Sequence, residues 1–418
     1  MTIVPAAHHI RLVRPSRCLE DAVTVPRVSG RLPTWLRFPQ IAVAGSARYV
    51  VGVEGVVGRV SDTSATPRSA LALRAYHVDR HEFVPAALRG DFVFAYPRSV
   101  VDRDGVLHVV WAEPDSADRR GLSDQNLHRM QFTTLWHAMF HDGRWSRPVA
   151  IYHAGEILWD VTNASKLIAD SSGALALAFG ANPRDHGGSV MAYLRFERHL
   201  WSVHELPFDL SPPIYVDLAA LGPRQIVIAY VTTNPAIHNV KQPSNQLYVV
   251  RSTDAGQTWG DRMPLSQWEQ GLAYQPRVVV DNKGTVHAVW IAGQNPHTLE
   301  AGALLHAIST DGSHWTAELA APFSGLVSEL QIAVDECDMV HVMITRVENG
   351  GLMLHHVRMP IAGVRTEDLP FAEPLFGPPS IMMDSGDLRV VWERRATGVA
   401  DSGSVRPAVT MYGSIRIR

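Results

Sequence analysis

Short alternating apolar and polar segments, separated by turns, recur along the whole chain. The two clearest copies occupy residues 97–111 and 276–290, and each reads as an apolar strand, a turn and a second apolar strand. The first of these turns begins with Asp102 and closes with Gly105, so the pattern predicts a β-hairpin. No helical period of useful length appears anywhere, and we therefore expect an all-β fold.

Looser copies of this hairpin give units that begin at residues 39, 97, 165, 216, 276, 330 and 379. Adjacent starts are 49 to 68 residues apart. Most units continue with a second pair of strands, such as residues 135–140 with residues 145–151. Four antiparallel strands in a repeat of roughly 50 residues are typical of a β-propeller blade.

Residues 1–418 are therefore predicted to form a single β-propeller domain of seven four-stranded antiparallel blades. The blades are expected to start near residues 36, 94, 162, 213, 273, 327 and 376. The seventh unit runs out of strands, so the N-terminal segment 1–35 should supply one, from residues 10–13 or residues 23–28. Such a strand would close the ring and protect its last edge.

Composition narrows the function classes. The formal net charge of −3 gives no reason to expect nucleic acid or an anionic membrane as a partner. No apolar run approaches the roughly 20 residues of a membrane span. Cys18 and Cys337 are the only cysteines, which fits a reducing compartment. The N-terminus lacks a basic segment followed by an apolar core, so we expect a cytoplasmic monomer, or a secreted protein if a signal has been removed.

One stretch, residues 252–259, reads Ser-Thr-Asp-Ala-Gly-Gln-Thr-Trp. Asp254 can accept hydrogen bonds from N–H groups inside the turn, Gly256 can supply a positive φ, and Trp259 can cover the turn. A shortened copy occupies residues 309–315. The stretch resembles the Asp-box, or BNR repeat, of the sialidase-like β-propellers and matches it at all four defining positions. In that family the box marks the fold and lies away from the catalytic centre.

This resemblance also implies candidate chemistry. Sialidases proper have six blades, which makes a six-bladed ring the alternative here. Arg37, followed by Phe38 and Pro39, resembles the arginine of the family's Arg-Ile-Pro motif, which holds the substrate carboxylate. Arg98 and Arg277 are candidates for the two further arginines of the family's triad. Tyr274 with Glu329 is the candidate for its Tyr–Glu nucleophile pair.

A polar residue lies just inside each predicted innermost strand. These seven ring residues are Gln40, Arg98, Lys166, Asp217, Arg277, Gln331 and Ser380. Because innermost strands surround the axis of a propeller, the ring should lie near one mouth of the central channel, where three cations against one carboxylate favour an anionic ligand. Tyr96, Tyr215 and Tyr274 lie beside the ring and could stack on a sugar or transfer a proton. The alternative is that the ring residues are structural and bond to one another and to channel water.

Histidines supply a second group of candidates. Asn-Pro pairs follow the second strand of three successive units and lead to His186, His238 and His297. On neighbouring loops of one face these side chains could act as acid–base groups or bind a divalent metal, the one cofactor that the sequence suggests. Asn-Pro is also a common turn pair, which is the structural alternative.

Other histidines and aspartates recur at fixed repeat positions. His108, His287 and His341 fall on second strands, and His137, His306 and His355 look similar on third strands; we interpret all six as packing residues. The aspartates at the hairpin turns are 102, 170, 281, 335 and 384, and we interpret them as turn residues.

The leading interpretation is a carbohydrate-active enzyme that acts on an anionic glycan, or a related anionic ligand, at one mouth of the channel. Cleavage could be hydrolytic, with a carboxylic acid and a nucleophile, or a lyase β-elimination assisted by cations and proton-transfer groups. One alternative is a non-catalytic propeller that binds glycan or protein. Another is a cytoplasmic enzyme of specialised metabolism built on the same fold.

Overall fold

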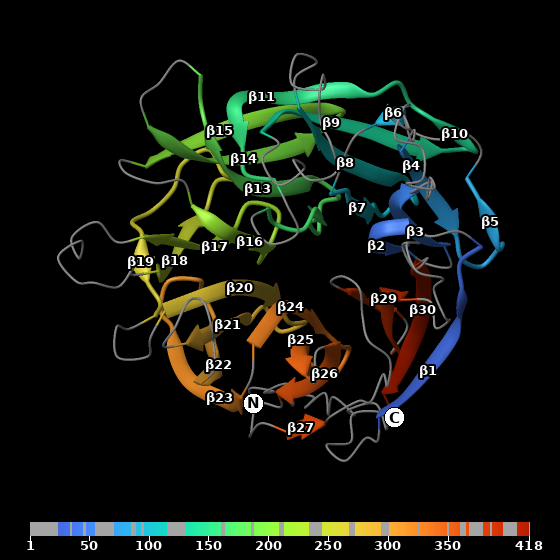
Figure 1. Cartoon of the computed structure of the whole chain (residues 1–418). Helices are drawn as coiled ribbons and strands as arrows, with labels where there is room; N and C mark the ends of the chain where they lie inside the picture. The colour runs from blue at the N-terminus through green and yellow to red at the C-terminus, as the bar shows by residue number, and fades with distance from the viewer. Residues whose placement is uncertain are drawn as a thin grey trace, which may run out of the picture.

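The computed structural model describes most of the chain and consists of β-strands. The described residues are 24–33, 36–44, 47–54, 71–84, 89–92, 96–114, 131–159, 164–184, 188–208, 213–233, 245–266, 272–293, 301–324, 326–348, 351–359, 365–367, 379–384, 387–395 and 408–417. Within these ranges there is no helix, and hence none long and apolar enough to cross a membrane. The strands form antiparallel sheets that stand around a common centre in a propeller-like arrangement (Figure 1).

The strands follow one another around the ring in chain order. One sheet contains β2 (Leu36–Ala44), β3 (Ala47–Glu54), β4 (Leu71–His77), β5 (Glu82–Phe83) and β6 (Arg89–Phe92). A nine-stranded sheet contains β7 (Arg98–Val101), β8 (Leu107–Glu113), β9 (Phe132–His141), β10 (Arg144–Trp145), β11 (Val149–Ile157), β12 (Ile168–Ala169), β13 (Leu175–Asn182), β14 (Ser189–Glu197) and β15 (Leu200–Phe208). It spans two predicted repeat units, which join where Glu156 of β11 lies opposite Asn182 of β13.

The remaining sheets have four strands each. They are β16 (Ile214–Ala220), β17 (Ile226–Thr233), β18 (Asn245–Ser252) and β19 (Met263–Pro264); β20 (Leu272–Val280), β21 (Val286–Gly293), β22 (Ala301–Ser309) and β23 (Thr316–Ser324); and β24 (Leu326–Val334), β25 (Val340–Glu348), β26 (Gly351–Met359) and β27 (Arg365–Glu367). The last sheet combines β28 (Ser380–Asp384), β29 (Asp387–Arg395) and β30 (Ala408–Ile417) with β1 (Thr24–Arg31).

The N-terminal strand completes the last sheet. β1 runs antiparallel to β30, from Thr24 opposite Ile417 to Arg31 opposite Met411. In Figure 1, β1 covers the outer side of β30, so that edge is paired rather than open. Of the two segments that the sequence offered for this role, the one predicted at residues 23–28 overlaps the observed strand, Thr24–Arg31, and residues 10–13 lie outside the described residues.

The core lies between neighbouring sheets. Trp111, Trp290 and Trp392 occupy the same position in the second strands β8, β21 and β29, and each is at most 2% exposed. Trp111 packs with residues of β3 and β4, and Trp290 packs with residues of β17 and β18, so each indole fills the gap to the preceding sheet. Burial of these large aromatic surfaces holds adjacent sheets together.

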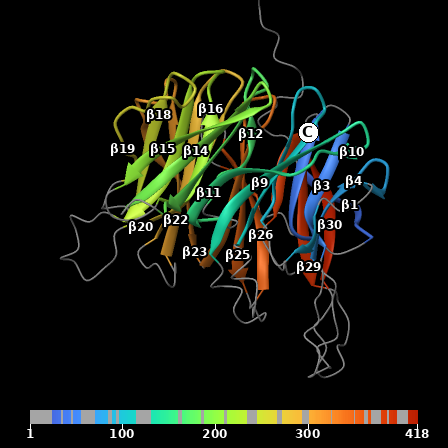
Figure 2. The ribbon, with the colours of Figure 1, turned by 90° about the horizontal axis from the view of Figure 1, so that it is seen from above.

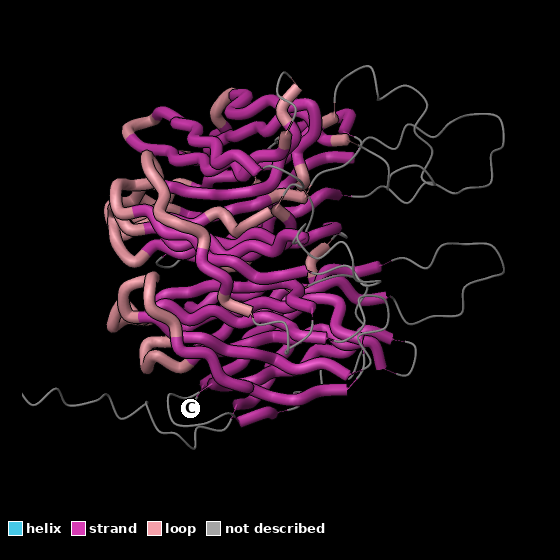
Figure 3. Tube along the Cα trace, turned by 90° about the vertical axis from the view of Figure 1, so that its left-hand side faces the viewer, coloured by secondary structure: helices cyan, strands magenta, loops and turns pink. Residues whose placement is uncertain are grey.

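The two faces of the ring differ. Ile214, at the start of β16, lies opposite Val231 near the end of β17, so innermost strands begin on the face where second strands end. We call this face, where β2, β16, β20 and β24 begin, the mouth. All sheets run between the same two faces (Figure 2), and the described hairpin turns gather on the face opposite the mouth (Figure 3).

The interpretation of the two cysteines as thiols that fit a reducing compartment is wrong for Cys337. Cys337, in the turn between β24 and β25, is disulfide-bonded. Cys18, the only other cysteine of the sequence, lies outside the described residues.

Candidate functional site

Three innermost strands carry the same β-bulge at the mouth. The ladder moves from Arg37↔Val53 to Gln40↔Val51, from Ile214↔Val231 to Asp217↔Ala229, and from Tyr274↔Ile291 to Arg277↔Val289. Each step places one extra residue on the inner strand. The bulged residues are Phe38 (φ 51°), Tyr215 (φ 51°) and Gln275 (φ 47°), all in the left-handed region.

This position is one that glycine usually fills. In bulges whose first residue is left-handed, glycine avoids the clash of a Cβ atom with the backbone. A larger residue there costs on the order of 1–3 kcal/mol, and such strain tends to persist at functional sites. The mouth therefore holds three strained residues, two of which are aromatic.

Aromatic side chains line the mouth beside these bulges. The ring centroids of Phe38 and Tyr96 lie 4.4 Å apart, and those of Tyr215 and Tyr274 lie 6.2 Å apart. Tyr96 precedes its ring residue, Arg98, by two positions, as Phe38 and Tyr215 precede theirs. Phe38, Tyr96 and Tyr215 are half-buried, whereas Tyr274 is buried. Burial raises the pKa of Tyr274, and its hydroxyl has no hydrogen-bond partner among the described residues.

The two ring arginines link adjacent innermost strands. Arg98 donates from Nε to the carbonyl oxygen of Ser165 (3.0 Å) and from Nη2 to that of Ala164 (3.2 Å), and its guanidinium lies 5.6 Å from the ring centroid of Trp159. Arg277 likewise donates from Nε to the carbonyl oxygen of Leu330 (2.9 Å). Both side chains are buried, so their charges satisfy backbone carbonyls of the next sheet.

Other ring residues make the complementary contact with backbone amides. Asp217 Oδ2 accepts a hydrogen bond from the N–H of Val278 (2.9 Å), and Ser380 Oγ accepts one from the N–H of Ile41 (3.2 Å). Lys166 differs, because its side chain is 38% exposed while its Nζ donates to the carbonyl oxygen of Val278 (2.7 Å) and lies 3.6 Å from Asp217 Oδ2. The ring thus has the structural contacts of the alternative interpretation, with Lys166 as its more accessible cation.

Three buried carboxylates lie toward the mouth ends of their strands. Glu393, 2% exposed, accepts the N–H of Phe38 at Oε1 (2.8 Å), and Glu113, 1% exposed, accepts Trp111 Nε1–H (2.9 Å). Glu329, also buried, lies opposite Thr345 in the β24–β25 ladder. The sequence analysis missed Glu113 and Glu393. The signal was an acidic residue one or two positions after the tryptophan of an otherwise apolar second strand.

Several predicted site residues are not placed by the described structure. Arg37 lies on β2 opposite Val53, and its side chain is not described. His186, His238 and His297 lie outside the described residues. Among the residues that are described, no group of three or more His, Cys, Asp or Glu side chains could hold a metal ion. The three-histidine site therefore stays a prediction.

The histidines on the second strands form hydrogen-bonded chains away from the mouth. Trp201 Nε1–H donates to Nδ1 of His137 (3.1 Å), so a neutral His137 carries its proton on Nε2. That nitrogen lies 3.1 Å from Nδ1 of His108, whose Nε2 lies 3.1 Å from Oδ2 of Asp102. The hydrogen bonds therefore run in one direction: Trp201 donates to His137, His137 donates to His108, and His108 donates to Asp102, with both imidazoles neutral.

The same arrangement occurs twice more. The two further chains are Asp281–His287–His306, with contacts of 3.4 and 3.0 Å, and Asp335–His341–His356, with contacts of 3.2 and 2.9 Å. Burial lowers the pKa of His137 to about 3 and that of His306 to about 4. In the last chain the partner is His356 rather than the expected His355, because side chains alternate between the two faces of β26.

Arginine replaces the imidazoles in two units. Arg195 Nη2 lies 2.7 Å from Oδ2 of Asp170, and Arg389 Nε lies 2.9 Å from Oδ2 of Asp384. All five turn aspartates therefore have a basic partner. Asp102, Asp170, Asp281 and Asp335 also accept backbone N–H groups of their own turns, as with Val106 N–H and Asp102 Oδ1 at 2.9 Å. These groups stabilise the turns opposite the mouth.

The turn at residues 252–259 has the geometry that its residues predicted. Asp254 Oδ1 accepts the N–H of Thr258 (2.8 Å), Gly256 has φ 87°, and the ring of Trp259 packs 5.2 Å from that of Tyr193. Hydrogen bonds, first from the Thr258 hydroxyl, lower the pKa of Asp254 to about 2. The N–H of Ala255 binds the carbonyl oxygen of Arg224 in the turn between β16 and β17, so this element lies on the face opposite the mouth.

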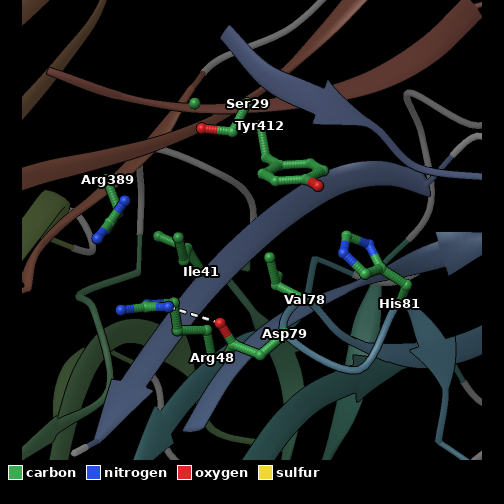
Figure 4. A pocket seen from close by; sticks show the side chains of 9 residues that line it. Ser29, Ile41, Arg48, Val78, Asp79, His81, Arg389 and Tyr412 are labelled. Atoms are coloured by element: carbon green, nitrogen blue, oxygen red, sulfur yellow. Dashed lines mark hydrogen bonds and ion pairs between the residues drawn. The ribbon is translucent and has the colours of Figure 1, made fainter. Parts of the chain in front are cut away.

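A pocket lies between the first sheet and the last (Figure 4). Arg48, Asp79, His81, Arg389 and Tyr412 are among the side chains around it. Arg48 lies 2.7 Å from Asp384 Oδ2, which Arg389 shares, and 2.5 Å from Asp79 Oδ1. Both guanidinium groups are paired with carboxylates, and the Arg48–Asp384 pair joins the two sheets, so we interpret this region as a structural contact between the first and last sheets.

Comparison with known proteins identifies the fold. No protein-family model matches the chain, and no curated protein matches it in sequence. A protein of unknown function from Dyadobacter fermentans is 16% identical (TM-score 0.50), covering 78% of this chain and 94% of its own. The polysaccharide lyase Uly1 is 13% identical (TM-score 0.50; 93% and 91%). A PL25 ulvan lyase bound to -[GlcA(1-4)Rha3S]- is 11% identical (TM-score 0.54; 93% and 95%). At these identities the likeness shows the fold alone.

Proposed function

We propose that the chain is a closed, seven-bladed β-propeller of the sialidase-like type. Seven repeat starts along the sequence support this count, as does the division of the nine-stranded sheet at the short β11–β13 contact. The pairing of β1 with β30 supports closure of the ring by the N-terminal segment. The hydrogen-bonded turn at residues 252–259 supports the likeness to the Asp-box.

We propose further that the protein is a carbohydrate-active enzyme whose site is the mouth. The observation that supports this proposal is the repeated strained bulge, at which Phe38 and Tyr215 precede the ring residues of their strands at the mouth. Lys166, the more exposed cation of the ring, suits an anionic group of the ligand. The resemblance in fold to two polysaccharide lyases is an analogy that favours a glycan.

Two reactions suit these groups. In β-elimination a base removes the proton at C5 of a uronate, the C4–O bond breaks, a C4=C5 double bond forms, and the leaving oxygen takes a proton. Tyr96, Tyr274 and the three loop histidines are the candidate proton-transfer groups, and Lys166 would stabilise the carboxylate. In hydrolysis, water is added across the glycosidic bond with the help of two carboxyl groups, for which Glu329 and Glu113 are candidates.

The test is a panel of acidic and neutral polysaccharides incubated with the purified protein. New reducing ends with ultraviolet absorbance from the conjugated double bond identify a lyase, and new reducing ends without that absorbance identify a hydrolase. Binding without new ends would replace the enzyme by a glycan-binding propeller. The proposed function would be refuted if the protein neither bound nor cleaved any polysaccharide of the panel.

A further inference from the structure

We infer that two aromatic platforms on opposite sides of the mouth bind an oligosaccharide that extends across it, rather than a single sugar. The first platform is Phe38 with Tyr96, and the second is Tyr215 with Tyr274. This inference rests on the proposed function and names its ligand more narrowly. It assigns the contact with sugar rings to the half-buried Phe38, Tyr96 and Tyr215, with the buried Tyr274 packed beside Tyr215, rather than to the ring residues Arg98 and Arg277.

The platforms are placed by the sheet arrangement. Phe38 and Tyr96 precede the ring residues of the first two units, at β2 and β7, and Tyr215 and Tyr274 belong to β16 and β20. Figure 1 shows β2 and β7 on one side of the centre and β16 and β20 on the other. A ligand that touches both platforms must therefore span the entrance of the channel, which a chain of several sugars can do.

The backbone under the first platform is held by buried groups. The Phe38 N–H donates to Glu393 Oε1 (2.8 Å), and the Tyr96 carbonyl oxygen accepts Trp159 Nε1–H (2.8 Å). Glu393 and Trp159 are each 2% exposed, so they have little freedom to move. Side chains held in this way are preorganised, which reduces the entropy lost on binding.

Core packing alone does not account for these aromatic residues. Phe38 and Tyr215 occupy left-handed positions at which glycine is free of strain, and yet both keep large rings that are half-buried. Each ring packs against a core cluster and keeps part of its surface exposed, and exposed aromatic surface is of the kind that the C–H face of a pyranose can cover. Lys166, whose side chain is 38% exposed, would orient a carboxylate group of the sugar chain.

The test compares leucine variants with variants that keep an aromatic ring. Phe38→Leu and Tyr215→Leu retain apolar bulk, whereas Phe38→Tyr and Tyr215→Phe retain the ring. The probes are oligogalacturonates and xylo-oligosaccharides of two, four and six sugars, titrated calorimetrically under conditions in which no cleavage is detected. Melting temperatures are measured in parallel.

We expect wild-type affinity to rise at least tenfold from the disaccharide to the hexasaccharide of the better series. Each leucine variant should lose that gain, and the ring-retaining variants should stay within about threefold of wild type. For wild type alone, the sugar-face protons should shift upfield in NMR spectra through aromatic ring currents, which tests the inference even if a leucine variant does not fold.

Two outcomes separate this inference from the proposed function. If wild type binds oligosaccharides but shows no dependence on length, no upfield shifts and no loss in the leucine variants, the platforms are not the contact surface and the proposed function stands. If wild type binds neither series at any length, the proposed function fails and the platform inference fails with it.

Discussion

The buried imidazoles show how one residue type can act structurally at several places in a repeat. In the chain from Trp201 to Asp102 each nitrogen of His108 and His137 has a partner while both rings stay neutral. Protonating His137 would put two N–H donors against each other and a charge in a site that is 2% exposed. Buried neutral imidazoles of this kind make the free energy of unfolding depend on pH, and they take no part in chemistry at the mouth.

This gives a prediction for acid stability. The pKa of His306 is about 4 in the folded protein against an ordinary value of 6.5. Between these values the unfolded chain binds a proton that the folded chain does not, so the free energy of unfolding should fall as pH decreases from 6.5 to 4. The share of His306 is roughly 3 kcal/mol when summed over that range. Urea denaturation of wild type and His306→Asn at several pH values would measure it.

The matched control for this prediction is a histidine on the surface. His141 is exposed at the end of β9, so His141→Asn should leave the pH profile of stability as it is in wild type. The pairs Asp170–Arg195 and Asp384–Arg389 hold the same turn position without an imidazole, and an arginine keeps its charge throughout this range. Identical profiles for wild type and His306→Asn would contradict the prediction.

Sequence alone predicted that these residues recur but not what they contact. A histidine ten residues after Arg98 indicates a repeat position, and that position is indeed buried. The partner of His341 depends on the register between β25 and β26, which places His356 rather than its neighbour in reach. Likewise, Arg98 binds carbonyl groups of residues 164 and 165, which no local pattern relates to it.

At the scale of a strand, polar side chains at the mouth link neighbouring innermost strands. Ring arginines donate to carbonyl oxygens of the next innermost strand, and Asp217 and Ser380 accept its N–H groups. Open edges of innermost strands are satisfied in this way. The bulges that precede the ring residues were not predictable, because the residues in them are not the glycines that mark a positive φ in a sequence.

Arg277 is buried and Lys166 is partly exposed, so replacing these two ring residues should have different effects. Arg277→Ala should lower the free energy of unfolding by about 2–3 kcal/mol, since it leaves the buried Leu330 carbonyl without its charged donor. Lys166→Ala should change stability much less and weaken binding of oligogalacturonate, because its ammonium group is partly exposed. Thermal denaturation and calorimetric titration of both variants separate the roles. Equal affinities of wild type and Lys166→Ala would remove Lys166 as the anion contact.

The turn around Asp254 should affect stability without affecting the mouth. Its carboxylate accepts two hydrogen bonds from Thr258, and the turn lies on the opposite face. Asp254→Ala should therefore lower the melting temperature and leave glycan affinity unchanged. Asp261→Ala, at an exposed aspartate a few residues further on, is the control and should melt like wild type. A normal melting temperature combined with lost glycan binding would contradict the structural role of this turn.

For the whole molecule, most of the strand arrangement can be predicted from the spacing of the repeats and from the turn residues. Each hairpin of the form Asp102 to Gly105 is local, so alternating strands and their turns can be predicted from sequence. Joining the ends of the ring is a long-range event, and the sequence offered two segments for it. The structure pairs residues 24–31 with β30, a contact between segments almost 400 residues apart that no local pattern specifies. The disulfide at Cys337 is likewise a long-range feature that two isolated cysteines do not indicate.

The contact between the first and last sheets gives a final prediction, because a few side chains make it. Thr410, fully buried on β30, accepts the Leu36 N–H at Oγ1 (2.7 Å) and donates to the Leu36 carbonyl oxygen (2.9 Å). Thr410→Val keeps the shape and leaves both backbone groups of Leu36 unsatisfied, which should cost roughly 2–4 kcal/mol. Thr133 is equally shielded, but its hydroxyl has no partner among the described residues, so Thr133→Val should be neutral or stabilising. Calorimetry measures both changes, and hydrogen exchange should show faster opening of β1 and β30 in Thr410→Val alone. Equal melting temperatures for the two variants would contradict the prediction that unfolding begins at the contact between the first and last sheets.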